Sequence, residues 1–294
     1  MGAFDAVVAR PSGVGGRLVV DAERASAVRW TPGDGELDRF EAEGGESGWC
    51  GGCLTWDGAQ ALPLEVARED LVGALPSTSA ARPSFEILHS TTTRKGRRKI
   101  VRTDPFLCAT EAEAEACVAA IRRASGLSRG RKRVMVVLNP VSGKGAGSTH
   151  WSAVVKPALD AAGIEHDLFR TGASGDAEAC ARDVDADVHD AFAIIGGDGT
   201  LHEAIQGLFD GRDPREARKV AFAVIPTGSG NGFAASIGNV DVQTATWCLL
   251  RNERAPMDVV SIVQPSQPGR RLMCLTTTFG FIADLDLDTE HLRW

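Results

Sequence analysis

The sequence lacks the marks of a membrane-spanning or secreted protein. No run of apolar residues approaches the roughly 18 that span a bilayer, and the N-terminus does not show the basic and then apolar order of a signal peptide. The seven cysteines are odd in number and scattered, which fits reduced intracellular thiols better than a disulfide framework. Met1-Gly2 does not predict myristoylation, because Ala6 stands where that pattern requires Ser or Thr. We therefore expect a cytoplasmic protein.

An excess of positive charge is also absent. The chain has 32 Lys and Arg against 39 Asp and Glu, a net charge of -7, which argues against a general nucleic-acid binder. The charge is uneven, however, since residues 94–133 hold 12 basic and four acidic residues between two acidic flanks. The basic stretches 94–102 and 129–133 could bind an anionic membrane surface, at about 1 kcal/mol per residue. A solvated hairpin tip and a solvated linker would explain them equally well.

The length of 294 residues, of which 43% are apolar, predicts about two globular domains at roughly 150 residues each. Short strands between glycine-rich turns dominate the first part, and residues 84–89 and 100–102 flank a basic turn as in a β-hairpin. Thr110 and Glu113 form a capping box that opens a helix ending near Ser125. Several strands closed by a C-terminal helix resemble a pleckstrin-homology-like module, a regulatory or membrane-binding segment over residues 1–127.

After a basic linker at 128–132 the pattern changes to strands, loops and helices in alternation, which predicts an α/β domain with a doubly wound sheet over 133–255. We expect strands at 133–138, 165–170, 191–195 and 220–225, and helices from near Ser148 with a break at Pro157, at 176–184, at 201–209 and at 242–251. Two further strands, 257–263 and 271–279, have no helix between them. A β-sandwich domain is therefore expected to begin at 256–294.

Three glycine-rich loops follow the expected strands of the α/β domain, at residues 139–147, 196–200 and 226–231. In an open parallel sheet, ligands bind at the carboxyl ends of the strands. Glycine lets backbone N–H groups approach phosphate oxygens, and the helix N-termini add positive dipole ends. Neither the GxxxxGK[ST] nor the GxGxxG spacing is present. The loops therefore predict a phosphate-binding crevice of a different kind.

The residues of these loops resemble a known family. Asn139-Pro-Val-Ser-Gly-Lys-Gly, Gly196-Gly-Asp-Gly-Thr and Pro226-Thr-Gly-Ser-Gly-Asn are similar to the motifs of lipid kinases of the diacylglycerol kinase catalytic-domain superfamily. Together with His202-Glu203 and residues 279–288, they resemble sphingosine kinases, whereas ceramide kinases usually break the Gly-Ser-Gly-Asn string. The resemblance implies that ATP, with Mg²⁺, phosphorylates the primary hydroxyl of a sphingoid base, converting sphingosine to sphingosine 1-phosphate.

The resemblance also implies site residues. Asp198 matches the catalytic residue; because an ordinary carboxylate has a pKa near 4, it would accept the hydroxyl proton late in a loose transition state. The nucleotide-binding positions are implied to be Asn139, Pro140, Val141, Lys144, Thr171, Glu203, Gly228, Ser229, Gly230 and Arg293. The substrate-binding positions are implied to be Gly196, Gly197, Gly199, Thr276, Asp286 and Glu290.

Several of these residues have simpler explanations. Asp198 could hold an Asx turn, and Glu290 with Arg293 could be a surface ion pair on a helix. If residues 279–288 are extended, Asp284, Asp286 and Asp288 share a face with Glu290, which leaves a calcium site as an alternative. No residue of the sequence identifies the ligands of Mg²⁺.

Two other motifs do not support the functions that their residues suggest. The pair Cys50 and Cys53 has thioredoxin-type spacing but neither the strand before it nor the helix after it, and it lacks a second pair for zinc. His202-Glu203 is no metalloprotease motif because Gln206 replaces the second His. The family's β-sandwich would continue beyond Trp294, so a fragment with impaired activity is expected. Ceramide or diacylglycerol kinase activity and a catalytically dead nucleotide- or lipid-binding regulator remain alternatives, ahead of NAD kinase.

Overall fold

The computed structural model describes residues 3–9, 15–21, 23, 26–32, 64–77, 81–266 and 269–289. The chain divides into two compact units, and each is treated by itself. The first unit consists of residues 1–134, 150–166 and 242–252, and the second of residues 135–149, 167–241 and 253–294. Cys50 and Cys53 lie outside the described residues. Within the described part of the chain, no helix is long and apolar enough to cross a membrane.

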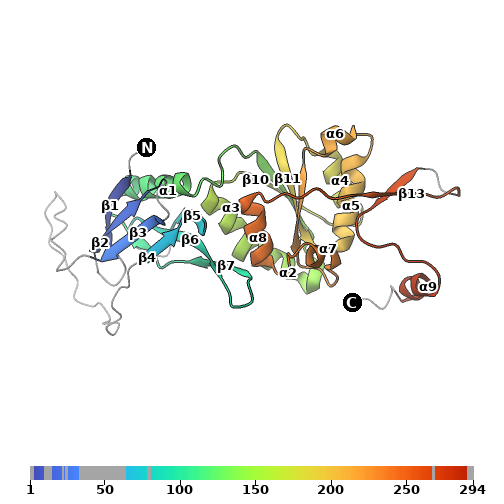
Figure 1. Ribbon diagram of the computed structural model, residues 1–294, viewed down its shortest axis with the longest axis horizontal. Helices are drawn as coiled ribbons and strands as arrows, with labels where there is room; N and C mark the ends of the chain where they lie inside the picture. The colour runs from blue at the N-terminus through green and yellow to red at the C-terminus, as the bar shows by residue number, and fades with distance from the viewer. Residues whose placement is uncertain are drawn as a thin grey trace. The chain divides into compact units, whose positions relative to one another are not determined.

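The first unit contains an antiparallel sheet with the strand order β4-β3-β2-β1-β8-β6-β5, in which β7 also pairs with β6 (Figure 1). Its strands are β1 (Phe4–Ala9), β2 (Gly15–Val20), β3 (Ser26–Pro32), β4 (Leu64–Ala67), β5 (Leu71–Pro76), β6 (Ser84–Thr92), β7 (Arg98–Arg102) and β8 (Phe106–Leu107). The predicted basic hairpin is confirmed, since β6 and β7 pair in register from Thr92 opposite Arg98 to Leu88 opposite Arg102.

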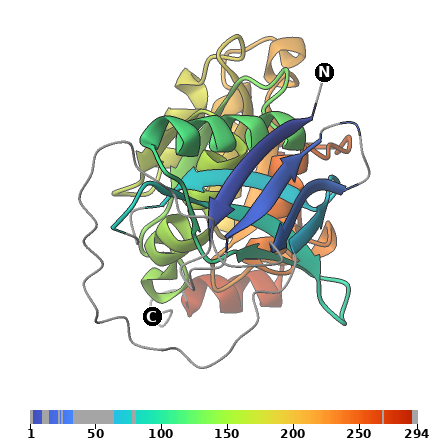
Figure 2. The same cartoon turned by 90° about the vertical axis from the view of Figure 1, so that its left-hand side faces the viewer.

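Helix α1 (Glu111–Ser125) closes this sheet as predicted and lies against its strands (Figure 2). Thr110 Oγ1 accepts the N–H of Glu113 at 3.2 Å, and Glu113 Oε2 accepts the N–H of Ala109 at 3.0 Å, so the helix start is capped from both sides. The helix buries Ile121 against a core that includes Trp30 and other aromatic side chains of the sheet. The identification of this part as pleckstrin-homology-like stays a prediction.

Three helical segments from the predicted α/β domain belong to the same unit: η1 (Trp151–Val155, a π-helix), α3 (Lys156–Ala162) and α8 (Val242–Arg251). Helix α3 packs on β5 so closely that a Cβ on Gly73 would lie 1.9 Å from the carbonyl oxygen of Ala161. The Arg122 guanidinium donates to the Asp160 carbonyl at 2.8 Å and the Ala161 carbonyl at 3.3 Å, and burial lowers its pKa. The predicted domain boundaries remain untested, but these helices pack on the N-terminal sheet.

The α/β sheet has the order β10-β9-β11-β12, from β9 (Arg133–Leu138), β10 (His166–Arg170), β11 (His189–Gly196) and β12 (Ala221–Pro226). Strands β11 and β12 are parallel, and this confirms a mixed α/β fold with a parallel sheet. The helices of this unit are α2 (Ser142–His150), α4 (Asp176–Asp183), α5 (Asp198–Phe209), α6 (Pro214–Ala217) and α7 (Gly232–Ser236). Helices α4 and α5 bury Ala181, Leu201 and Ile205 against the sheet (Figure 1). Because chain order reverses between β9 and β11, ligands are expected above those two strands.

The first glycine-rich loop is shorter than predicted. Helix α2 starts at Ser142 rather than near Ser148, because Asn139 Oδ1 accepts the N–H of Val141 at 3.2 Å and turns the chain into the helix at once. The break predicted at Pro157 is present: π-helix η1 precedes it and α3 carries the proline in its first turn. Proline has no N–H to continue the ladder, which explains the change of helix type.

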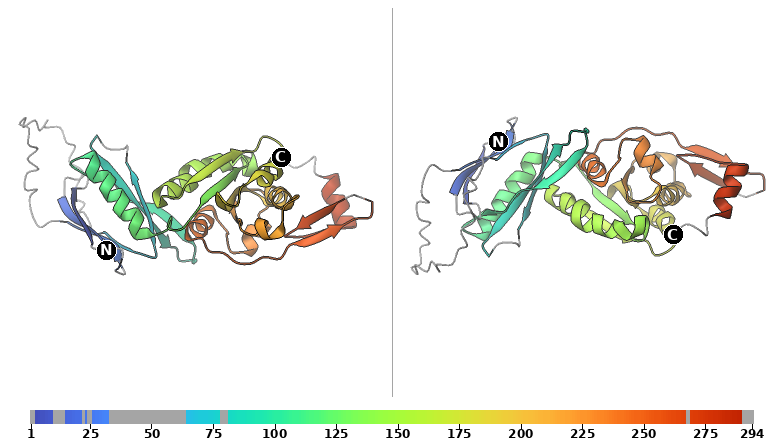
Figure 3. Two further views of the ribbon diagram at one scale, coloured as in Figure 1. Left: turned by 90° about the horizontal axis from the view of Figure 1, so that it is seen from above. Right: turned by 90° about the horizontal axis from the view of Figure 1, so that it is seen from below.

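The C-terminal segment differs more from the prediction. Strands β13 (Val260–Val263) and β14 (Arg270–Met273) form an antiparallel pair but are shorter than expected, and a β-sandwich is not confirmed (Figure 3). The segment 279–288, which the calcium-site alternative required to be extended, contains helix α9 (Phe281–Asp288) after Gly280, whose φ of 69° permits the turn. The predicted acidic face is therefore wrong, because alternate residues of a helix point in different directions. Phe279, Phe281 and Leu287 are exposed.

Candidate nucleotide-binding and catalytic site

The three predicted loops meet at the carboxyl ends of β9, β11 and β12. The backbone N–H of Asn139 donates to the carbonyl of Ile195 at 3.0 Å, and that of Thr227 donates to the carbonyl of Gly196 at 3.1 Å. These bonds continue the hydrogen bonding of the sheet one residue beyond the strands, so the first residues of the loops lie side by side. The convergence predicted for this edge of the sheet is therefore present.

Glycine lets these loops contact each other through their backbones. A Cβ on Gly143 would lie 1.8 Å from the carbonyl oxygen of Thr227, and one on Gly228 would lie 2.5 Å from the Cα of Gly197. A Cβ on Gly197 would meet the carbonyl oxygen of Gly230 at 2.9 Å. Gly143 also has a φ of 55°, which other residues rarely adopt. These glycines are thus required for loop packing, whatever ligand the loops bind.

Asp198 is the first residue of α5 and lies between these loops. Its Oδ2 accepts the N–H of Gly232 at 2.8 Å and its Oδ1 accepts the N–H of Phe233 at 3.0 Å. These two N–H groups stand at the start of α7, where no helical carbonyl is available to them. The carboxylate is partly exposed and fixed in direction by one backbone bond to each oxygen.

Two residues that the sequence analysis did not single out shape the loops. Asn231 Oδ1 accepts the N–H of Gly228 at 3.0 Å, and its Nδ2 donates to the Gly228 carbonyl at 2.6 Å, so that one amide side chain closes the third loop. Thr200 is buried, and its Oγ1 accepts from Asn139 Nδ2 at 3.3 Å. The contact between Asn231 and Gly228 had a signal in the sequence, since an Asn directly before a helix and three residues after a glycine favours such a bond.

The remaining nucleotide positions surround the loops. Thr171 follows β10, and its N–H donates to the Leu138 carbonyl at 3.0 Å. Glu203 on α5 accepts from Ser174 Oγ at 2.9 Å, so it lies beside the loop after β10. The other predicted positions differ in exposure: Val141, Gly199, Ser229 and Gly230 are exposed, Pro140 is half-buried and Gly196 is buried. Lys144 lies in α2, and its side chain is outside the description.

The predicted substrate residues near the C-terminus are only partly described. Thr276 is exposed in the segment between β14 and α9. Asp286 lies in α9, where the structure describes its backbone but not its side chain. Glu290 and Arg293 fall outside the described residues. Burial and, to a smaller extent, the charge of Asp198 raise the pKa of the Cys274 thiol. Within the described ranges, no three His, Cys, Asp or Glu side chains gather as a metal site.

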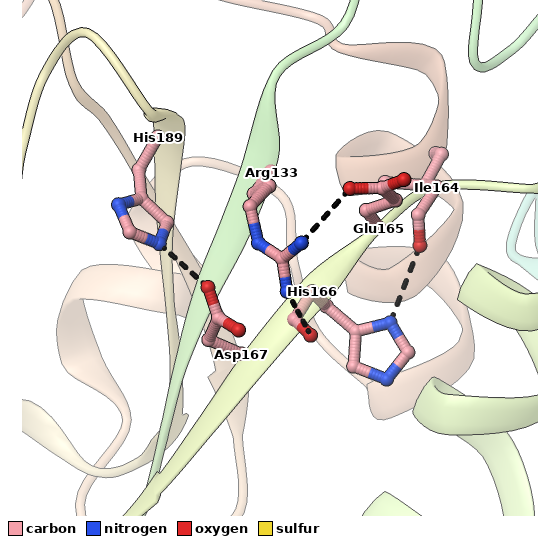
Figure 4. A network of polar contacts seen from close by, with 6 residues as sticks. All are labelled: Arg133, Ile164, Glu165, His166, Asp167 and His189. Carbon is pink, nitrogen blue, oxygen red and sulfur yellow. Dashed lines mark hydrogen bonds and ion pairs between the residues drawn. The ribbon is translucent and has the colours of Figure 1, made fainter.

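The opposite ends of the strands carry a separate polar network (Figure 4). At the amino end of β11, His189 Nε2 contacts Asp167 Oδ2 at 2.9 Å. At the amino end of β9, Arg133 Nη1 donates to Glu165 Oε2 at 2.9 Å. These contacts lie at the ends of β9 and β11 away from the glycine loops, so they stabilise the sheet rather than belong to the candidate site.

Part of the chain is similar in sequence to known lipid kinases. Residues 133–262 match the family model described as the diacylglycerol kinase catalytic domain. The chain is 33% identical over 178 residues to sphingoid long chain base kinase 5 of Saccharomyces cerevisiae, which covers 59% of this chain and 26% of that protein. It is 35% identical over 172 residues to sphingosine kinase 1 of Homo sapiens, which covers 55% and 44%.

A solved structure titled as a putative diacylglycerol kinase from Bacillus anthracis is 27% identical, with a TM-score of 0.38 over 44% of each chain. The matches with the yeast and human kinases span less than half the length of either protein. The family match covers β9 to β13 and includes all three loops. The resemblance seen in the motifs is confirmed: residues 133–262 match the diacylglycerol kinase catalytic domain, and the chain is similar in sequence to sphingoid base and sphingosine kinases.

Proposed function

We propose that this protein transfers the γ-phosphate of ATP to the primary hydroxyl of a sphingoid base. The carboxylate of Asp198 carries the proposal, because it lies where three backbone-packed loops meet at the carboxyl edge of the sheet. The sequence similarity to sphingoid base and sphingosine kinases supports the choice of acceptor. Ceramide and diacylglycerol are the alternative acceptors.

Asp198 can accept the proton of the attacking hydroxyl while keeping its structural bonds. A carboxylate offers about four acceptor positions, and the N–H groups of Gly232 and Phe233 occupy one on each oxygen. The remaining positions stay available to a substrate hydroxyl. Proton transfer to a weak base of this kind comes late, after the bond between the γ-phosphorus and the oxygen of the leaving ADP has lengthened.

ATP would lie along the loops, with its triphosphate near the exposed backbone of Ser229 and Gly230. The other nucleotide contacts in this proposal are Asn139, Pro140, Val141, Lys144, Thr171, Glu203, Gly228 and Arg293. Mg²⁺ would neutralise the charge that develops on the phosphates when the nucleotide is bound. Thr276, Asp286 and Glu290 would contact the acceptor lipid.

The proposal is tested with a panel of acceptors. The chain is incubated with Mg²⁺ and radiolabelled ATP, and sphingosine, ceramide, diacylglycerol and NAD are supplied separately. We expect labelled sphingosine 1-phosphate and at least a tenfold lower rate with the other three acceptors, a difference of about 1.4 kcal/mol. Faster labelling of ceramide or diacylglycerol would show that this lipid, and not sphingosine, is the acceptor. ATP binding without transfer to any acceptor would favour a nucleotide-binding regulator.

We also propose that the β6–β7 hairpin contacts an anionic membrane surface. Arg94, Lys95, Arg97 and Lys99 are exposed at or beside its tip, whereas Arg98 is held by Asp70 at 2.6 Å. The tip is a formed turn, since the N–H of Thr93 donates to the Arg97 carbonyl at 2.8 Å. A fixed cluster of basic side chains suits a surface that carries lipid phosphates.

Reversing two of these charges should weaken membrane binding. The double variant Arg94→Glu and Lys95→Glu is expected to bind phosphatidylserine-containing vesicles at least about 30-fold more weakly, from about 1 kcal/mol for each basic residue lost. The double variant Arg215→Glu and Arg218→Glu is the control, because it makes the same charge change at exposed residues of the other unit. Vesicle sedimentation measures both. Equal losses in the two variants, or binding to pure phosphatidylcholine vesicles, would contradict the proposal.

A further inference from the structure

Gln206 makes an unusual contact far from the glycine loops. It lies on α5, eight residues after Asp198, and only 8% of it is exposed. Its Nε2 donates to the Leu272 carbonyl at 2.7 Å, and its Oε1 accepts the N–H of Leu272 at 3.0 Å. One side-chain amide therefore satisfies both backbone groups of a residue on β14, as a neighbouring strand would.

The contact anchors β14 from the side that faces α5. On its other side β14 pairs with β13, with Leu272 opposite Ser261. The side chain of Leu272 is buried in the core of this unit together with Leu201 and Ile205 of α5. Both the backbone and the side chain of Leu272 therefore contact α5, and these contacts attach the β13–β14 hairpin to that helix.

The residues after Leu272 run toward the start of α5. Positions 198, 202 and 206 are four residues apart and share one helix face. A Cβ on Gly232 would lie 3.4 Å from a Leu275 methyl and 3.5 Å from Asp198 Oδ2. Gly232 is itself bonded to Asp198 through its N–H. The segment 272–275 therefore extends from Gln206 at one end to Asp198 at the other.

We propose that Gln206 is a positioning residue, which fixes the segment 272–276 beside Asp198 and so sets where an acceptor lipid can lie. The lipid part rests on the proposed kinase function. The placement of the segment does not, since it follows from the contacts of Leu272. An amide is needed because Leu272 presents one acceptor and one donor, while the same Nε2 also donates to the His202 carbonyl at 3.3 Å. A carboxylate cannot donate to the Leu272 carbonyl, and a thioether can supply neither bond.

Hydrogen exchange at the Leu272 amide tests the placement without any activity. In Gln206→Met we expect at least a tenfold loss of protection, together with at least tenfold faster alkylation of the Cys274 thiol by iodoacetamide. Cys180 on α4, whose thiol pKa is raised to about 11 by burial, should react at an unchanged rate in the same sample. Equal exchange and equal alkylation in the wild-type protein and this variant would overturn the inference.

The variant Gln206→Glu separates a hydrogen-bonding role from simple packing. Burial raises the pKa of this carboxyl above its ordinary value near 4, so only at about pH 10 is the glutamate charged; it then repels the Leu272 carbonyl, and protection of Leu272 should be lost. At about pH 5 the protonated carboxyl offers one donor and one acceptor, so protection should return, after correction for intrinsic exchange. The control Gln243→Glu should show no such pH dependence, because Gln243 uses only its oxygen, toward the N–H of Ile100 at 2.8 Å. A pH-independent loss in Gln206→Glu would overturn the inference.

A kinetic readout connects the placement with the proposed function. In Gln206→Met the KM for sphingosine should rise about tenfold while the KM for ATP stays unchanged. If the wild-type chain does not phosphorylate sphingosine, the kinase proposal fails, and the exchange and alkylation results still decide the role of Gln206. If the wild-type chain is active and both KM values change equally, the positioning role is wrong.

Discussion

Replacing Asp198 by Asn should lower the rate of phosphate transfer to sphingosine by about 10²-fold to 10⁴-fold, the usual contribution of a positioned acid or base. The amide keeps the size of the carboxylate but cannot take up the hydroxyl proton. The KM values should change little, because the loops that would hold the nucleotide are built from other residues. Radiolabelled phosphate transfer measures the effect, and a variant that retains the wild-type rate would remove Asp198 from the chemistry.

The same substitution should also cost stability. Asp198 accepts the N–H groups of Gly232 and Phe233, and the amide of Asn can accept only one of them. A lost bond to a charged acceptor costs about 1–3 kcal/mol, which is small enough for the chain to remain folded. Thermal unfolding measures this cost separately from turnover.

Asp176→Asn is the matched control for both effects. The Asp176 carboxylate accepts the N–H groups of Gly172 at 2.6 Å and Ala173 at 2.9 Å, and these bonds lower its pKa. Both N–H groups donate to Oδ2, so the control removes a charged acceptor from a neighbouring loop while the oxygen of the Asn amide can keep both bonds. We expect it to lower the unfolding temperature but to keep turnover within about threefold of wild type. An equal loss of turnover in both variants would show that loop disruption, and not proton transfer, explains the effect at Asp198.

Local patterns predicted many of the strands and helices after residue 132. The apolar run 133–138 and the periodic segment 242–251 match β9 and α8, because a strand or a helix with strong periodicity is specified by its own residues. The three loops were found because glycine before a helix and after a strand is a local signal. The motif around Asp198 then supplied the family.

Contacts between distant side chains and backbones could not be predicted in this way. Gln206 bonds Leu272, 66 residues further along the chain, and nothing near Gln206 indicates that partner. The packing of α3 on β5 depends on Gly73 in a part of the chain that was expected to form a separate module. Helix α9 was not predicted, because its acidic and apolar residues alternate and alternation is the signal of a strand. In each of these cases tertiary contacts or a local turn overrode the pattern.

Replacing Gly207 by Ala should destabilise the α/β unit, although helix propensity predicts the opposite. In an exposed helix the change from Gly to Ala gains about 1 kcal/mol. Gly207 lies inside α5, and a Cβ there would be 1.9 Å from the carbonyl oxygen of Glu178 on α4 and 2.7 Å from its carbonyl carbon. Both are backbone atoms, so no side-chain rotation relieves the contact and the two helices must separate. We expect a net loss of about 2 kcal/mol, within the usual cost of overpacking.

Gly199→Ala is the matched control, because it lies in the same helix and a Cβ there meets no atom within 4 Å. This variant should be as stable as wild type or up to about 1 kcal/mol more stable. Urea unfolding followed by the helical circular dichroism signal compares the two variants. Opposite signs would show that the backbones of α4 and α5 are in contact at Gly207, whereas stabilisation in both would mean that the helices lie further apart. Since α5 begins at Asp198 and carries Gln206, the separation forced by Gly207→Ala should also displace both residues and lower turnover.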